Sequence, residues 1–162
     1  MEGNIIASNP TWSNGTASIT LNKGTNVANN LTIQYQVNGI NDNNWITGTN
    51  VTGLHHNDTV YARLTDGINN GNYASVDIVD NIKPNATISL SGTSTTTAGS
   101  VTAKVTLKDN ESGVNVTASK WVYNTNSGNI GTNESSYNNN FSSNGQTITL
   151  KATTPGTYYL HV

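Results

Sequence analysis

Cysteine is absent from the sequence, and charged residues are scarce. Without cysteine the chain forms no disulfide, no zinc–thiolate site and no thiol nucleophile. Charged residues make up 10% of the chain, and the formal net charge is −2 with a pI near 5.8. Proteins that bind nucleic acid or anionic membrane surfaces need a basic face, which this composition does not supply. We therefore expect no nucleic-acid partner.

Long apolar runs are also missing. No segment approaches the roughly 20 consecutive apolar residues that a membrane-spanning helix requires, so the sequence predicts no membrane insertion. The N-terminal MEGNII lacks the basic and apolar regions of a secretion signal. This is compatible with a segment excised from a longer chain.

The sequence instead contains short segments of alternating hydrophobicity, separated by stretches rich in Asn, Gly, Ser and Thr. Apolar and polar residues alternate in TASITL (16–21), LTIQYQV (31–37) and VTAKVTLK (101–108). A period of two residues is typical of half-buried strands, and no segment keeps the period of a helix. Asn and Gly favour the turns between such strands. We therefore predict an all-β fold.

A segment that recurs in similar form near the C-terminus predicts two domains. The segment DTVYARL (58–64) aligns with GTYYLHV (156–162), turn residue on turn residue, with inward positions matched to inward positions. Between the two copies lies VDNIKPNA, in which Pro84 cannot donate to a sheet ladder. We place the boundary at Ile82, which gives domains 1–82 and 83–162.

These segments resemble the immunoglobulin-like or fibronectin-type-III-like repeats of Gram-positive cell-surface proteins. The first half carries the resemblance through PTW at 10–12, IQYQVNG at 33–39 and TVYARLTDGINNGNYASVDIVDNIKP at 59–84. The second half carries it through LKDNESGV at 107–114, KWVY at 120–123 and PGTYYLHV at 155–162. The resemblance implies two consecutive immunoglobulin-like β-sandwich domains located outside the cell, on its surface or secreted.

The resemblance also implies an incomplete second domain. Such modules continue past the strand that corresponds to GTYYLHV into a turn and one more strand. We therefore expect domain 83–162 to lack its last strand and to expose an open sheet edge, which favours edge-to-edge pairing with a second copy.

Two classes of function fit this architecture. The favoured one is a non-catalytic structural or adhesive module that acts as a spacer or interaction domain, with neighbouring modules of the same polypeptide and a host or cell-wall glycan or protein as partners. The alternative is a carbohydrate-binding module, or an accessory domain of a secreted enzyme or phage tail protein. The candidate ligand-binding residues are Trp12, Trp45, Tyr61, Arg63 and Tyr73.

Core packing competes with ligand binding for the tryptophans, because the chain has one Phe and needs large apolar residues inside. Arg63 has the outward parity of its strand. Its guanidinium is expected either to stay in water or to stack on an aromatic ring.

No catalytic residue, cofactor or metal is predicted. The sequence has no GxSxG, HExxH or phosphate-loop motif, so an enzyme is not expected. Asp109 and Glu111 offer calcium two carboxylates, fewer than the six to eight oxygens it takes, so whether calcium binds there is left open. His55 and His56 are adjacent and on a strand would face opposite sides. Lys120, beside Trp121, is an ambiguous candidate for an isopeptide cross-link, which needs an apolar core.

Overall fold

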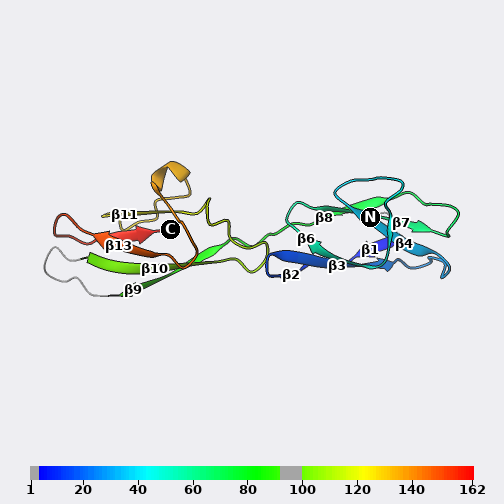
Figure 1. The fold of residues 1–162 in the computed structure, drawn as a ribbon, viewed down its shortest axis with the longest axis horizontal. Coiled ribbons are helices and arrows are strands. Elements are labelled where there is room, and N and C mark those ends of the chain that lie inside the picture. The colour runs from blue at the N-terminus through cyan, green and yellow to red at the C-terminus, as the bar shows by residue number, and fades with distance from the viewer. Residues whose placement is uncertain (1–3, 92–99) are drawn as a thin grey trace. The chain divides into compact units, whose positions relative to one another are not determined.

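The computed structural model describes residues 4–91 and 100–162. It divides into two compact units, one formed by Met1–Ile82 with Asn110–Ser112 and the other by Lys83–Asp109 with Gly113–Val162. The protein is all-β, as the alternating segments predict, and its sheets are antiparallel (Figure 1). In the described part of the chain, no helix has the length and hydrophobicity that crossing a membrane requires.

The first unit contains two sheets. One joins β1, β2 and β6 to a central β3, and the other has the order β5-β4-β7-β8. The strands are β1 (Ile5–Ala7), β2 (Thr11–Ser13), β3 (Thr16–Lys23), β4 (Thr32–Val37), β5 (Ile46–Thr47), β6 (Asn50–Leu54), β7 (Thr59–Thr65) and β8 (Ala74–Asp77).

Alternate residues of these strands fill one hydrophobic core. On β3, Ala17, Ile19 and Leu21 are at most 3% exposed, as their alternation with Ser and Thr predicts. Val60 and Ala62 of β7 reach the same core from the other sheet and are fully buried. The predicted inward parity of both strands is therefore confirmed, and the opposite side of β7 faces outward.

Asparagine and glycine shape the connections. Asn14 and Gly15 have φ of 51° and 83°, and they join Ser13 of β2 directly to Thr16 of β3. Two successive residues with positive φ make the tight hairpin turn whose twist matches the flanking strands, and Asn followed by Gly is its preferred sequence.

The second unit is also built from two sheets, with orders β13-β10-β9 and β12-β11-β14. A 3-10 turn, η1 (Glu134–Ser136), lies between β11 and β12. The strands are β9 (Asn85–Ser91), β10 (Ser100–Lys108), β11 (Lys120–Asn124), β12 (Asn139–Asn140), β13 (Thr147–Lys151) and β14 (Tyr159–His161). The buried cluster of this unit contains Val105, Leu107, Phe141 and Ile148.

Candidate functional site

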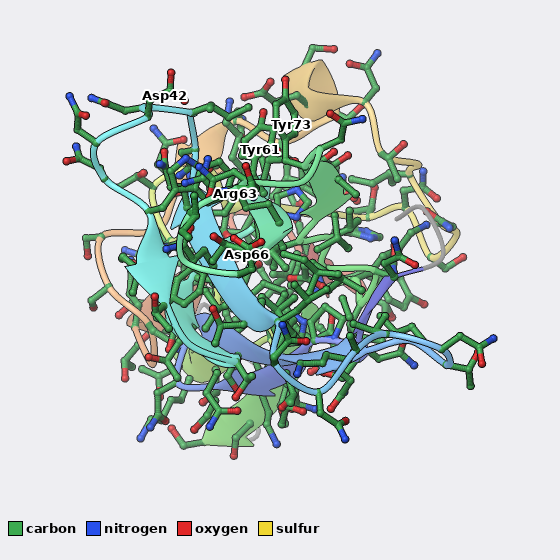
Figure 2. The ribbon with its side chains drawn as sticks, turned by 90° about the vertical axis from the view of Figure 1, so that its right-hand side faces the viewer. Asp42, Tyr61, Arg63, Asp66 and Tyr73 are labelled. Carbon is green, nitrogen blue, oxygen red and sulfur yellow. The ribbon has the colours of Figure 1, made fainter. Side chains whose placement is uncertain are left out.

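Four of the five candidate ligand-binding residues gather at the outer face of sheet β5-β4-β7-β8, on the side away from the core. Tyr61 and Arg63 stand at alternate positions of β7, while Trp45 directly precedes β5 and Tyr73 directly precedes β8. Figure 2 shows Tyr61, Arg63 and Tyr73 close together on this side of the first unit. The antiparallel register brings them together although they lie up to 28 residues apart in sequence.

Arg63 is held by two neighbours. Its guanidinium carbon lies 4.0 Å from the centre of the Trp45 ring, and its Nε donates to Gln34 Oε1 at 3.0 Å. Gln34 is the cross-strand partner of Arg63 on β4. Of the two predicted environments for this guanidinium, the structure shows stacking on an aromatic ring, a contact in which the cation meets the negative face of the indole.

The two tyrosines form a second pair. Their ring centres are 5.8 Å apart with an angle of 80° between the planes, an edge-to-face contact. The Tyr73 side is open to solvent, with 53% of the residue exposed. The aromatic residues of this face therefore contact each other or Arg63, and they do not form one flat surface.

Trp12 lies elsewhere. It stands on β2 of the other sheet, opposite Ala17, and packs against the hydrophobic core. The structure thus brings Trp45, Tyr61, Arg63 and Tyr73 together and separates Trp12 from them.

Gln36 was missed by the alternation argument, which places it outward beside Gln34. It is 6% exposed, because the loop after β4 folds over this part of the outer face. Its amide oxygen accepts a hydrogen bond from the Asn41 backbone N–H at 2.7 Å, and its amide nitrogen donates to the Asn41 carbonyl. These two hydrogen bonds attach the loop to the sheet. The alternation of apolar and polar residues does not predict them.

Two carboxylates at the ends of the sheet serve as turn acceptors. Asp66 accepts backbone hydrogen bonds from Asn69 at 2.6 Å and Ile68 at 2.8 Å, and the first of these bonds is the main reason that its pKa lies below the ordinary value. Asp58 accepts from Asn38 Nδ2 at 2.7 Å, which is the main cause of its lowered pKa. Both groups are ionised near neutral pH and hold loops in place.

The other side chains considered from the sequence make contacts of their own. Glu111 Oε2 accepts from the Asn81 backbone N–H at 3.1 Å, and among the described residues no group of three or more His, Asp or Glu side chains is placed to hold a metal ion. His56 Nδ1 accepts from the Asp80 backbone N–H, and His55 lies 3.7 Å from Asp58 Oδ2. Lys120 is not enclosed in an apolar core, since its Nζ pairs with Glu134 at 2.6 Å and its side chain is 27% exposed.

Comparison with known proteins gives no assignment: no protein-family model matches the chain, and no curated protein sequence matches it.

Proposed function

We propose that the chain is a non-catalytic structural and adhesive part of an extracellular surface protein, built from two immunoglobulin-like β-sandwich domains, 1–82 and 83–162. Its role is that of a spacer or interaction domain. The all-β architecture with two compact units supports this proposal. The resemblance to repeats of Gram-positive surface proteins supplies the extracellular location.

The observation that carries the proposal is the internal pairing of the outer face. The guanidinium of Arg63 lies over one face of the Trp45 ring, and Tyr61 meets Tyr73 edge to face. A sugar platform needs aromatic faces that are free and nearly coplanar, whereas these groups stabilise the sheet through contacts with each other.

Isothermal titration with cell-wall fragments and mucin-type glycans tests the binding side of the proposal. We expect no heat of binding from the outer face. The carbohydrate-binding alternative is favoured by one feature, the exposed ring of Tyr73. Saturable binding that is lost in Tyr73→Ala and retained in Trp12→Ala would establish that alternative, because Trp12 lies on the other sheet.

A double-mutant cycle tests the structural side. If Arg63 and Trp45 stabilise the sheet by their contact, then Arg63→Ala and Trp45→Ala will show a coupling free energy of about 0.5–1 kcal/mol in urea unfolding. The matched cycle of Arg63→Ala with Trp12→Ala should be additive, since those residues do not touch. Equal coupling in the two cycles would argue against a stabilising role for the stack.

A further inference from the structure

The two units carry net charges of opposite sign. The second unit contains five Lys and two acidic residues, Asp109 and Glu134, which gives a formal net charge of +3. The first unit contains one Lys, one Arg and seven acidic residues, which gives −5. The value of −2 for the whole chain is the sum of these two charges. A charge asymmetry of this kind is one sign that part of a chain meets a charged partner.

Three of the five lysines stand on one side of the sheet β13-β10-β9. Lys104 and Lys108 lie on the central strand β10 with the same parity, and Lys151 of β13 pairs with Ser100, which shares that parity. All three lysines are exposed. We call this side of the sheet the lysine face.

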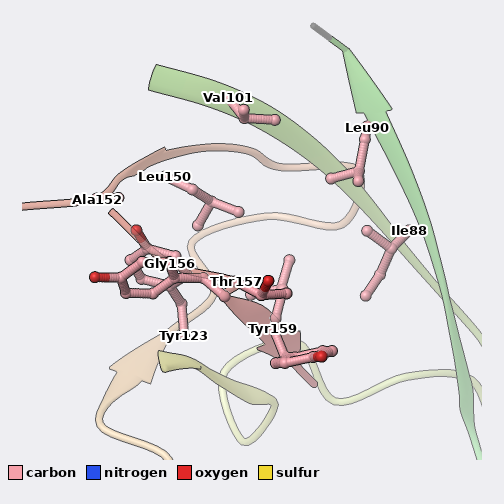
Figure 3. Close-up of a pocket in the computed structure, with 11 residues that line it drawn as sticks. Ile88, Leu90, Val101, Tyr123, Leu150, Ala152, Gly156, Thr157 and Tyr159 are labelled. Carbon is pink, nitrogen blue, oxygen red and sulfur yellow. The ribbon is translucent and has the colours of Figure 1, made fainter. Parts of the chain in front are cut away.

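The opposite side of the same sheet faces the interior of the second unit. Ala103 and Val105 alternate with the lysines on β10 and are fully buried. Figure 3 shows Ile88 of β9, Val101 of β10 and Leu150 of β13 around an apolar pocket on this side. Apolar side chains therefore point inward from all three strands, and the lysine face is the side turned to solvent.

No acidic side chain belongs to the lysine face. The sequences of β9, β10 and β13 contain no Asp or Glu, and Asp109, which follows Lys108, is half-buried. Elsewhere among the described residues of the second unit, Lys120 forms an ion pair with Glu134. The lysine face thus presents positive charge that no carboxylate of its own strands neutralises.

The three charges are spread along the sheet. At a rise of about 3.3 Å per residue, the Cα atoms of Lys104 and Lys108 are about 13 Å apart on β10. Ser100, the partner of Lys151, lies four residues from Lys104 in the other direction. The three lysines therefore follow a line of about 26 Å, which exceeds the size of a small anion and suits a linear polymer.

The other outward side chains of these strands are short and polar. They include Thr87, Ser89, Thr102, Thr106, Thr147 and Thr149. Hydroxyl groups both donate and accept hydrogen bonds, so they match the hydroxyl groups of sugars. The three strands contain no aromatic residue, on which nucleic-acid bases would stack and which protein interfaces use as anchors.

We propose that the lysine face binds a linear polysaccharide that carries carboxylate groups. The three lysines pair with carboxylates along the polymer, and the hydroxyl groups between them hydrogen-bond to the sugars. Each exposed ion pair is weak, but a polymer that reaches all three lysines binds more tightly than a single charged sugar does. The proposal rests on the interaction role proposed above and names the chemical class of the partner.

The test uses the full chain and polygalacturonate, a linear polysaccharide with one carboxylate on each sugar. Isothermal titration in about 20 mM salt should show saturable binding. The fully methyl-esterified polymer has the same backbone without the charge and should not bind. Binding to polygalacturonate should weaken at least tenfold between about 20 and 300 mM salt, because added ions screen exposed charges.

Matched substitutions locate the site. Lys104→Gln, Lys108→Gln and Lys151→Gln each remove one charge from an exposed position and should each weaken binding about threefold, and the triple variant at least tenfold. Lys120→Gln removes the same charge from the other sheet of the second unit and should leave binding unchanged. Lys104→Arg retains the charge and should bind as the parent does.

Four results overturn the proposal. The first is no binding at polymer concentrations up to about 1 mM in sugar units, and the second is equal weakening by Lys104→Gln and Lys120→Gln. The third is tighter binding to a DNA oligonucleotide or to phosphatidylserine vesicles than to polygalacturonate. The fourth is a polymer-free dimer that salt dissociates and that the triple variant does not form, which would assign the lysine face to a second copy.

Tyr73→Ala separates this proposal from the functions considered above. Tyr73 belongs to the first unit, so its loss should leave polygalacturonate binding unchanged. Binding that is lost in Tyr73→Ala and retained in Lys104→Gln would assign the polysaccharide to the first unit and overturn the proposal. Absence of binding to any polymer would leave the coupling of Arg63 with Trp45, and with it the structural role, unaffected.

Discussion

Asp58, Asp66 and Asp80 of the first unit accept hydrogen bonds that favour their ionised form. Asp80 is the clearest case, because its pKa is lowered well below the ordinary 3.8, mainly by the hydrogen bond from the Ser112 hydroxyl. The Ser112 backbone N–H donates to the same oxygen at 2.9 Å, and the Ile82 N–H donates to the other oxygen at 2.8 Å. Three donors that recognise the ionised form explain the direction of the shift.

The Asp80 hydrogen bonds predict an acid-sensitive contribution to stability. Because the folded-state pKa lies below the unfolded value, the unfolded chain binds protons first as the pH falls. The contribution is present above about pH 4 and is lost as the pH falls below 3.8 toward the lowered folded-state value. Ser112→Ala removes the hydroxyl donor, so we expect a flatter fall of unfolding free energy between pH 5 and about pH 2.

Ser112→Thr is the control, since it retains the hydroxyl. Urea unfolding followed by fluorescence across this pH range measures both variants. An acid dependence in Ser112→Ala identical to that of the parent would show that the hydroxyl does not lower the pKa of Asp80.

At the scale of elements, residues with a positive φ stand in several of the connections between strands. Asn14, Asn38 and Asn57 have φ of 51°, 58° and 71°, conformations that Asn tolerates better than other side-chain-bearing residues. Gly67, in the loop between β7 and β8, has φ of 93°. The Gly67 backbone N–H donates to the Thr65 hydroxyl at 3.1 Å, and this hydrogen bond helps to hold the loop in that conformation.

Replacing Gly67 with Ala should destabilise the first unit by about 1 kcal/mol or more. An added Cβ meets no atom within 4 Å, so the cost comes from the backbone conformation and not from a clash. Gly39→Ala is the matched control, because the space there is equally open and its φ is not in the left-handed region. Equal effects of the two substitutions on the urea midpoint would contradict this account.

The strands that sequence predicts best are those whose two sides meet different environments. Alternation places Ala17, Ile19 and Leu21 correctly, because a core covers one side of β3 and water the other. In β9 the same alternation of NATISLS is present, yet every residue is exposed. Burial depends on a covering layer, which the pattern of a single strand does not contain.

The candidate face was predictable as a set of residues but not as a set of contacts. Parity alone places Tyr61 and Arg63 on the outward side of β7. The stacking partner of Arg63 and the loop that buries Gln36 depend on where the chain from 38 to 45 returns to the sheet. That path is fixed in part by the side-chain hydrogen bonds of Gln36 to Asn41, which the alternation of apolar and polar residues does not contain.

At the scale of the whole molecule, two separate cores predict two steps of unfolding. The first unit closes its core with Ile78, which is fully buried, whereas the second leaves Ile88 and Leu90 partly in water. Burial of apolar area is the main favourable contribution to folding. We therefore expect the second unit to unfold at a lower urea concentration than the first.

Tryptophan fluorescence separates the two steps. Trp12 and Trp45 report on the first unit and Trp121 on the second. Trp121→Phe leaves reporters in the first unit alone, and the double variant Trp12→Phe with Trp45→Phe leaves Trp121 alone. Coincident transitions in the two variants would mean that the units unfold as one cooperative body.

The hairpin turn at Asn14–Gly15 is a site of slow chemical ageing. Asn is thermolabile, and in an Asn–Gly sequence the Gly backbone nitrogen attacks the side-chain amide carbon, releases ammonia and forms a succinimide ring. Water opens this ring to Asp or to isoaspartate. Asp, like Asn, tolerates the left-handed backbone that φ of 51° requires, whereas isoaspartate adds a methylene group to the main chain of a two-residue turn. Either product adds one negative charge to a chain whose net charge is −2. Stored protein would therefore separate into two acidic forms, one with the native turn between β2 and β3 and one in which that turn is distorted.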